Sequence, residues 1–126
     1  MLASWIQQAA FEPPMISVAV RKGRAIEAII DEAGGFVVNI LSDNPGAMFK
    51  HFGRGFGLDE EAFAGLATRD AGCGVVIEDR SAWMACRVRG KHDAGDHWIY
   101  LGEVVEGDAV EGGRPYVHLR KNGMSY

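Results

Sequence analysis

The sequence predicts a mainly β protein with peripheral helices, folded as an antiparallel barrel. Short apolar runs recur along the chain at hairpin spacing, with turn residues between them. Only one segment has a strong helical pattern, so the regular alternation of strands and helices that builds a doubly wound sheet is not seen. The 126 residues, 48% hydrophobic and 24% charged, suit a single folded domain over residues 1–126.

The first 20 residues predict a strand, a loop and a second strand. Apolar runs over residues 2–6 and 15–20 flank a stretch that ends in Pro13 and Pro14, which lack backbone N–H groups and block a helix. The residues between the runs are small or carry amides, so a ligand can approach the backbone closely. By composition alone, an ordinary connection is the commoner explanation.

A helix is expected over residues 24–33, ended by Gly34 and Gly35. Its apolar side chains fall on one face, at Ile26, Ile29, Ile30 and Ala33. The basic residues Arg21, Lys22 and Arg24 lie at its start, where cations oppose the helix dipole. A bound phosphate would resolve this conflict, and side chains that turn into solvent are the alternative.

The middle of the chain predicts a strand at residues 36–41 and a short helix that ends near Phe52. Asn39 interrupts the apolar strand, so its amide either bonds to neighbouring backbone or faces a ligand. Asp43, Asn44 and Pro45 predict the cap and first turn of the helix. Residues 54–74 then predict a long surface excursion of the kind that often binds ligands.

The second half predicts a β-hairpin and a final strand. Residues 81–89 alternate in polarity, residues 93–96 have turn composition, and residues 97–105 form the returning strand. A further turn over residues 107–113 leads to a last strand at residues 116–120.

Composition excludes several functional classes. The formal net charge of −4 disfavours a nucleic-acid partner, and no apolar run reaches the ~20 residues of a membrane span. The first residues lack the pattern of a secretory signal, so we expect a cytoplasmic protein. Cys73 and Cys86 lie apart without histidines at ligand spacing, which predicts reduced thiols and no metal site.

Six motifs in order resemble the flavin reductase-like family of FMN-binding split barrels. They are A-S-W-x-x-Q-A-x-F-x-P-P at residues 3–14, F-V-V-N-I-L at 36–41, H-F-G-R at 51–54, A-G-D-H-W at 94–98, G-E-V at 102–104 and H-L-R-K-N-G-M-S-Y at 118–126. The sequence is most similar to the reductase module at the C-terminus of cyanobacterial flavodiiron proteins and to related stand-alone reductases.

The resemblance implies a set of FMN-binding residues. Two short segments border the ring edge and ribityl chain: Ala3, Ser4 and Trp5, and Gln8, Ala9, Ala10 and Phe11. Arg24 and Ala25, at the start of the predicted helix, lie beside the phosphate. Asn39 matches a family asparagine near the cofactor. Ala25 stands where the family often has Ser or Thr, which removes one phosphate donor. His97 is the candidate catalytic residue, expected to orient groups beside the flavin and the nicotinamide entry side.

The resemblance further implies an NAD(P)H-dependent flavin reductase that passes electrons to an acceptor. The alternative is a non-enzymatic FMN module that exchanges electrons with a redox partner protein. The family is usually homodimeric, with FMN close to the subunit interface. Related proteins carry another strand before the segment that matches Leu2, so we expect this barrel to lack the usual N-terminal strand and to expose an edge.

Overall fold

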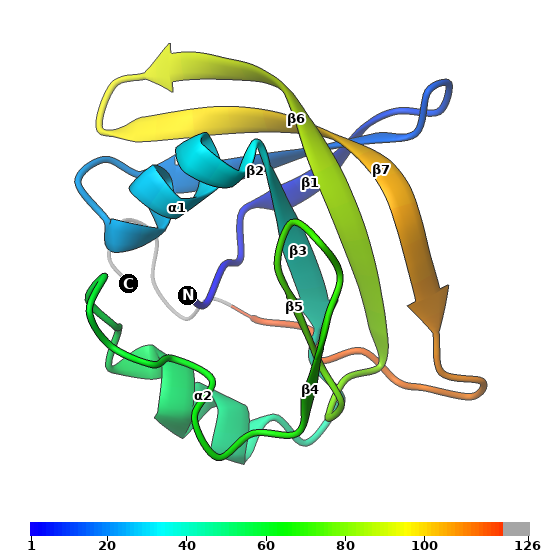
Figure 1. The fold of residues 1–126 in the computed structure, drawn as a ribbon. Coiled ribbons are helices and arrows are strands. Elements are labelled where there is room, and N and C mark those ends of the chain that lie inside the picture. Colours follow the sequence, from blue (N-terminus) through cyan, green and yellow to red (C-terminus); the bar gives the residue numbers. More distant parts are fainter. Residues whose placement is uncertain (120–126) are drawn as a thin grey trace.

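A curved antiparallel sheet dominates the fold in the computed structural model, which describes residues 1–119 (Figure 1). Its strand order is β1-β2-β7-β6-β3, with bounds β1 Ile6–Ala10, β2 Met15–Arg21, β3 Gly35–Ile40, β6 Ala82–Ala94 and β7 His97–Ala109. The remaining elements are a two-stranded sheet and two helices: β4 Thr68–Asp70, β5 Val75–Ile77, α1 Ala25–Ala33 and α2 Gly46–Gly53. The predicted mainly β fold with peripheral helices is confirmed.

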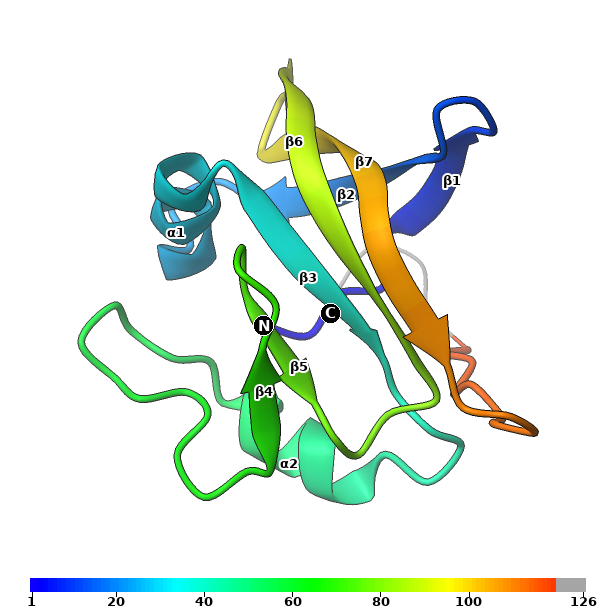
Figure 2. The same ribbon diagram turned by 45° about the vertical axis from the view of Figure 1, so that its right-hand side comes forward.

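The β6–β7 hairpin forms the centre of the sheet. Each strand has 13 residues, and the chain turns between them at Gly95, whose φ of 80° suits a residue without a Cβ. β7 pairs with β2 along its outer side, and β6 pairs with β3. Irregular pairing at Ala85/Cys86 and at Val88/Gly90 accompanies the strong bend of both strands that Figure 2 shows.

The main hydrophobic core lies between the sheet and α1. Strand β2 alternates as expected for a half-buried strand and buries Ile16, Val18 and Val20. From α1, Ile30 is buried and Ile26 packs against the same cluster, but Ile29 is 47% exposed and Ala33 is exposed. The apolar face of the helix is therefore narrower than its spacing predicts.

A second core lies under α2. Met48, Phe52 and Ile77 are buried there, and Leu2 from the N-terminal segment packs against them. The His51 ring lies 2.8 Å from the Ala62 carbonyl oxygen, which fastens the following loop to the helix. α2 begins at Gly46 with Pro45 at the N-cap, so the expected cap at Asp43 and Asn44 is wrong.

The first strand begins and ends later than the sequence predicts. It spans Ile6–Ala10 and pairs with β2 in the register Ile6↔Val18, so residues 7–10 lie in a strand and not in a loop. Residues 2–5 precede this strand, although the Trp5 carbonyl still accepts a hydrogen bond from the Ala19 N–H at 3.0 Å. Polar side chains are tolerated in β1 because it is an edge strand whose middle residues are exposed.

Two further expectations change in the second half. The excursion over residues 54–74 contains β4, which pairs with β5 across a tight turn near Gly72. Residues 116–119 form no strand. An isolated bridge between Ser42 and Pro115 and a hydrogen bond from the Tyr116 N–H to the Leu41 carbonyl at 2.8 Å hold this part of the chain. Arg120, the last residue of the predicted strand, lies outside the described residues, as does most of the tail motif.

The N-terminal segment connects the core under α2, where Leu2 packs, to strand β1 of the main sheet. In both ribbon views the N-terminus lies between α1 and α2, and the chain then runs into β1 (Figures 1 and 2). Within residues 1–119, neither helix is long and apolar enough to cross a membrane.

A substitution at Gly102 on β7 tests how tightly the side chains pack against this strand. A Cβ at this position would lie 2.6 Å from Phe36 Cζ and 3.0 Å from Cys86 Cβ. We expect Gly102→Ala to lower the free energy of unfolding by about 1–3 kcal/mol, because the crowded side chains must shift. Urea unfolding measures this change. Gly46→Ala is the control, since a Cβ there would meet no atom within 4 Å beyond its own helix backbone, and an equal loss in both variants would contradict the packing.

Candidate functional site

Trp5 and His97 meet at the α1 end of the sheet. Their ring centroids lie 4.9 Å apart with the planes tilted by 44°. Strand pairing explains the contact, because His97 begins β7 opposite Arg21 at the end of β2, and Trp5 lies beside Ala19 of β2. Trp5 and His97 are therefore neighbours, although they are 92 positions apart in the sequence. Both are predicted for the same site.

His97 is held in place on two sides. Its side chain is only 9% exposed, and Nδ1 lies 2.8 Å from Oδ1 of Asp96. This hydrogen bond holds the pKa of the exposed Asp96 carboxyl below its usual value. A ring fixed by a carboxylate on one side and covered by Trp5 on the other is suited to orient a neighbouring group.

The start of α1 follows β2, whose last residue, Arg21, pairs with His97. Arg24 occupies the N-cap with extended backbone angles, φ −81° and ψ 141°, and provides no side-chain cap. The first N–H groups of a helix have no partner within the helix, and they attract anions. An exposed arginine joined to an uncapped helix start is a donor set that fits a phosphate group.

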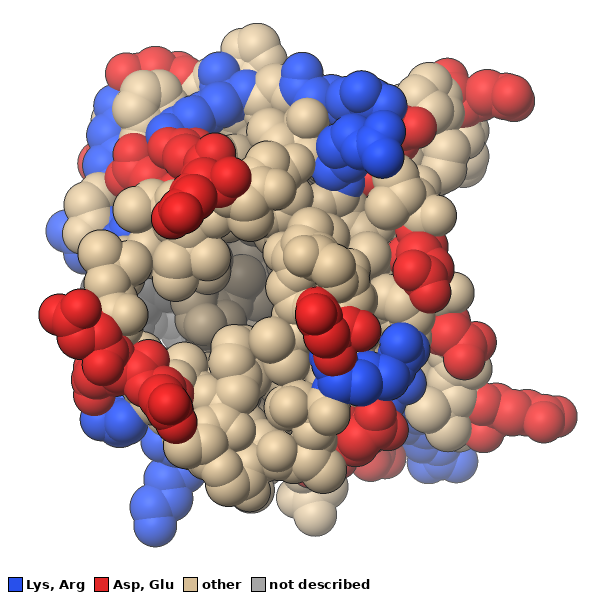
Figure 3. Space-filling view, in the orientation of Figure 1, with Lys and Arg blue, Asp and Glu red and all other residues tan. Residues whose placement is uncertain are grey.

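A hollow of about 360 Å³ lies beside the start of α1. It is lined by Gly23, Arg24, Ala25, Glu27, Ala28, Asp31 and Leu58. Leu58 comes from the long loop after α2, so this loop forms one side of the hollow. Figure 3 shows an opening between α1 and this loop, with acidic side chains on both sides and basic side chains over the β6–β7 hairpin above.

Lys91 on β6 joins the carboxylates of this hollow to the sheet. Its Nζ donates to Asp31 Oδ2 at 2.7 Å and to Glu27 Oε1 at 3.2 Å. The same Nζ lies 4.4 Å from the Trp98 ring centroid, and the Tyr100 hydroxyl donates to the other oxygen of Asp31 at 3.0 Å. Sequence reasoning missed this cluster because Lys91 is about 60 residues away from its acidic partners.

These contacts shift the pKa values of all three charged groups. The Gly23 backbone N–H, assisted by Lys91, holds the pKa of Glu27 below its usual 4.5. Lys91, followed by Tyr100, holds the pKa of Asp31 below its usual 3.8, and Asp31 in turn raises the pKa of Lys91. All three groups are therefore charged at neutral pH.

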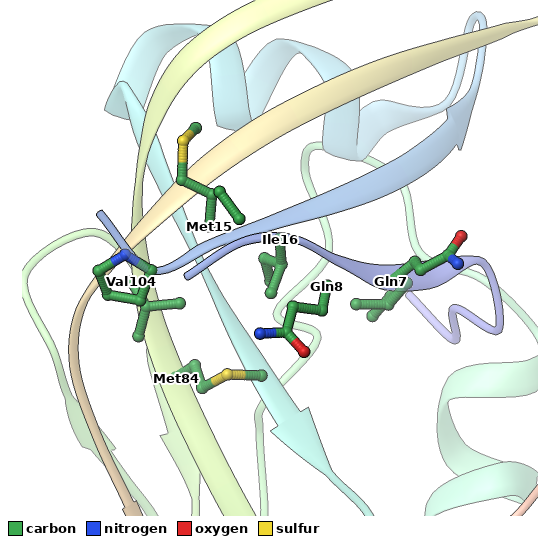
Figure 4. Close-up of a pocket in the computed structure, with 9 residues that line it drawn as sticks. Gln7, Gln8, Met15, Ile16, Met84 and Val104 are labelled. Carbon is green, nitrogen blue, oxygen red and sulfur yellow. The ribbon is translucent and has the colours of Figure 1, made fainter. Parts of the chain in front are cut away.

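A second hollow, of about 430 Å³, lies along β1 (Figure 4). Gln8 and Ala10 line it, together with apolar side chains such as Met15, Met84 and Val104. In Figure 4 the Gln8 side chain extends alongside Met84. Ala9 lies on the same exposed strand, and Phe11, at the hairpin turn beyond it, is 86% exposed. These predicted residues thus lie along the second half of β1 and the turn that follows it.

Asn39 has both ends of its amide engaged. Nδ2 donates to the Val75 carbonyl at 2.9 Å, and Oδ1 accepts from the Ile77 N–H at 2.9 Å. Of the two alternatives for Asn39, the geometry shows the bond to neighbouring backbone, which ties β3 to β5.

The two cysteines lie in β6 and in the turn between β4 and β5. Cys73 and Cys86 are free thiols, and burial, assisted by Cys73, raises the pKa of Cys86 to about 12. In the described part of the chain, no three His, Cys, Asp or Glu residues gather in a way that could hold a metal ion.

Comparison with known proteins identifies the family. The family model described as flavin reductase like domain matches residues 1–125. The chain belongs to the flavin reductase-like family. The putative diflavin flavoprotein A 6 of Nostoc sp. is 39% identical over 129 residues, and the match covers 100% of this chain and 23% of that protein. This chain therefore spans less than a quarter of such relatives, and membership of the family supports a flavin-related oxidoreductase role.

Solved structures confirm the split-barrel fold. The NADH:FAD oxidoreductase SgcE6 of Streptomyces globisporus superposes with a TM-score of 0.82 at 19% identity, over 90% of this chain and 69% of that one. Nitrilotriacetate monooxygenase component B of Mycobacterium thermoresistibile gives a TM-score of 0.74 at 28% identity, over 86% of this chain and 59% of that one. At 19% identity, the first likeness shows the fold alone.

The residues at the α1 end fit the flavin cofactor that the family implies. The uncapped helix start and the exposed Arg24 provide donors for a phosphate. Ala3 and Ser4 are small and exposed beside Trp5, so a ring or a ribityl chain can approach their backbone. Glu27 and Asp31 oppose an anion in the same hollow, but Lys91 offsets part of their charge.

Asn39 offers a direct test of its structural role. Asn39→Leu leaves the Val75 carbonyl and the Ile77 N–H without the amide, so we expect the free energy of unfolding to fall by about 2–4 kcal/mol. Urea unfolding measures the loss, and Asn44→Leu on an exposed loop is the control. Unchanged stability combined with lost flavin affinity would instead assign Asn39 to the cofactor.

The lowered pKa values predict an acid-sensitive contact at α1. Glu27 and Asp31 stabilise the fold above their ordinary pKa values of 4.5 and 3.8, and this contribution is lost as the pH falls through their lower values in the folded state. We expect the stability difference between the parent protein and Asp31→Asn to shrink between neutral pH and about pH 3. Urea unfolding across this range provides the measurement, and a difference independent of pH would contradict the assignment.

Proposed function

We propose that the protein is an NAD(P)H-dependent FMN reductase. The observation that carries the proposal is the match to the flavin reductase-like family over residues 1–125. The uncapped helix start at Arg24 and the contact between Trp5 and His97 support it. When bound, the flavin would accept a hydride from NADH or NADPH at N5 and pass two electrons to an acceptor.

The chain's own residues bind and orient the cofactor in this proposal. The Arg24 side chain and the backbone N–H groups of Arg24 and Ala25 hold the phosphate. Ala25 contributes only its backbone, because it has no hydroxyl group. The backbone of residues 3–5 borders the ribityl chain and the ring. His97, fixed by Asp96, orients Trp5 and shields that side of the site from water. Asn39 is outside this set, because both ends of its amide are bonded to β5.

A homodimer is part of the proposal. The hollow along β1 is lined mainly by apolar side chains and adjoins the exposed Phe11, while β1 is an edge strand of the sheet. A second copy that covers this face would remove apolar surface from water and would bring Gln8, Ala9, Ala10 and Phe11 to an interface. A cytoplasmic location accords with the two free thiols.

A second candidate is a non-enzymatic electron-transfer module that serves a redox partner. The relatives favour it, because the matched region is only 23% of the Nostoc diflavin flavoprotein, whose remaining length offers other modules as partners. In this case FMN would bind at the same residues, but the protein would not oxidise NADH or NADPH.

Flavin binding and anaerobic reduction separate these functions. We expect the purified protein to quench FMN fluorescence, and NADH or NADPH to bleach the flavin absorbance without oxygen. Binding without bleaching by either nucleotide would support the electron-transfer module. Absence of FMN binding would contradict both functions.

Matched arginine variants locate the phosphate in the same experiment. Arg24→Gln should weaken FMN binding about tenfold, because a charged hydrogen bond to phosphate is lost. Arg114→Gln, in an exposed loop after β7, removes the same charge elsewhere and should leave the affinity unchanged.

A further inference from the structure

The loop before α1 is held by a side chain that comes from within the helix. Glu27 Oε2 accepts a hydrogen bond from the Gly23 backbone N–H at 3.0 Å, and this bond spans the first turn. Gly23 itself has a φ of 75°, so the chain reverses at this point before it enters the helix. Lys22 holds the start of this loop through the Asp96 carbonyl and Asp93, and Glu27 holds its last residues, Gly23 and Arg24, against the helix.

Lys91, together with the Trp98 side chain, holds the Glu27 carboxylate. Its Nζ bonds the other oxygen, Oε1, at 3.2 Å, so both oxygens of Glu27 are used. Lys91 is itself restricted by Asp31 and by the ring of Trp98, and its side chain is only 26% exposed. A chain of contacts thus runs from the sheet through Lys91 and Glu27 to the Gly23 backbone.

Lys91 also changes the charge that an anion would meet in the hollow at α1. Glu27 and Asp31 both line this hollow and would repel a phosphate. A single lysine between them leaves a net charge of −1 where two free carboxylates would give −2. Removal of the lysine therefore has two effects, a looser loop and a stronger repulsion, and both act on a phosphate.

We propose that Lys91 is a positioning residue for the flavin phosphate: through Glu27 it fixes the backbone of Gly23 and Arg24, and it offsets the carboxylates beside them. This rests on the flavin site proposed above. Lys91 acts through other residues and does not itself contact the cofactor. Its contribution concerns the phosphate alone, so riboflavin, which has the same ring without the phosphate, distinguishes this role from a general effect on folding.

Fluorescence quenching with FMN and with riboflavin tests the proposal. We expect Lys91→Met to weaken FMN binding about tenfold and to change riboflavin binding less than about twofold. Lys91→Arg keeps the charge and the donors and should restore most of the FMN affinity. Lys50→Met, on the exposed side of α2, removes one positive charge elsewhere and should leave the ratio of the two affinities unchanged.

Two Glu27 variants of equal charge test the hydrogen bond between the Glu27 side chain and the Gly23 N–H. Glu27→Gln and Glu27→Ala both remove the carboxylate, but only glutamine keeps an acceptor for the Gly23 N–H. FMN should bind more weakly to Glu27→Ala than to Glu27→Gln, with equal riboflavin affinities. This comparison tests the contact between Glu27 and Gly23 even if Lys91→Met fails to fold, and Lys91→Arg compared with the parent protein then tests Lys91 itself.

The outcomes separate this inference from the proposed function. Equal losses of FMN and riboflavin affinity in Lys91→Met would overturn the role of Lys91 and leave the flavin site intact. Equal FMN affinities in the two Glu27 variants would overturn the positioning of Gly23 through Glu27. A parent protein that binds neither flavin would overturn the proposed function and this inference together.

Discussion

The pairing of β6 with β7 is the constraint on which the rest of the structure depends. β7 carries β2 and β1 on one side, and β6 carries β3 on the other, so each strand of the main sheet is placed by this hairpin. Its turn brings Lys91 and His97 to the same end of the sheet, in pairs with Tyr100 and Ala94. The long, bent hairpin therefore places both the residue that covers Trp5 and the residue that anchors α1.

Local patterns in the sequence predict much of this fold. The glycine stop after α1, the strand that begins at Met15 and the turn at Gly95 depend on neighbouring residues, and all three are found. The predicted start of β1 is wrong because its polar residues have no strand pattern of their own, and an edge position is what permits them. The β4–β5 hairpin escapes prediction for a related reason, since its strands have three residues each and are held by contacts such as that of Asn39.

In the candidate site too, motifs close in sequence are predictable, and contacts between distant segments are not. Family motifs nominate Trp5, Arg24 and His97 among other residues, and the structure places these three at one end of the sheet. The net charge near α1 does not follow from the local sequence. The basic residues before the helix suggest a positive site, but where their acidic neighbours lie depends on the fold. The fold pairs Lys22 with Asp93 and adds two carboxylates to the hollow, so Arg24 and the helix start remain as the main donors to an anion.

Amide chemical-shift mapping by NMR tests most directly whether a flavin binds at the α1 end of the sheet, with its phosphate at the helix start. On addition of FMN, the amides of residues 3–5 and 23–25 should shift, whereas riboflavin should shift the first group and leave the second nearly unchanged. Shifts restricted to the hollow along β1, or identical shifts at residues 23–25 with both flavins, would contradict this placement.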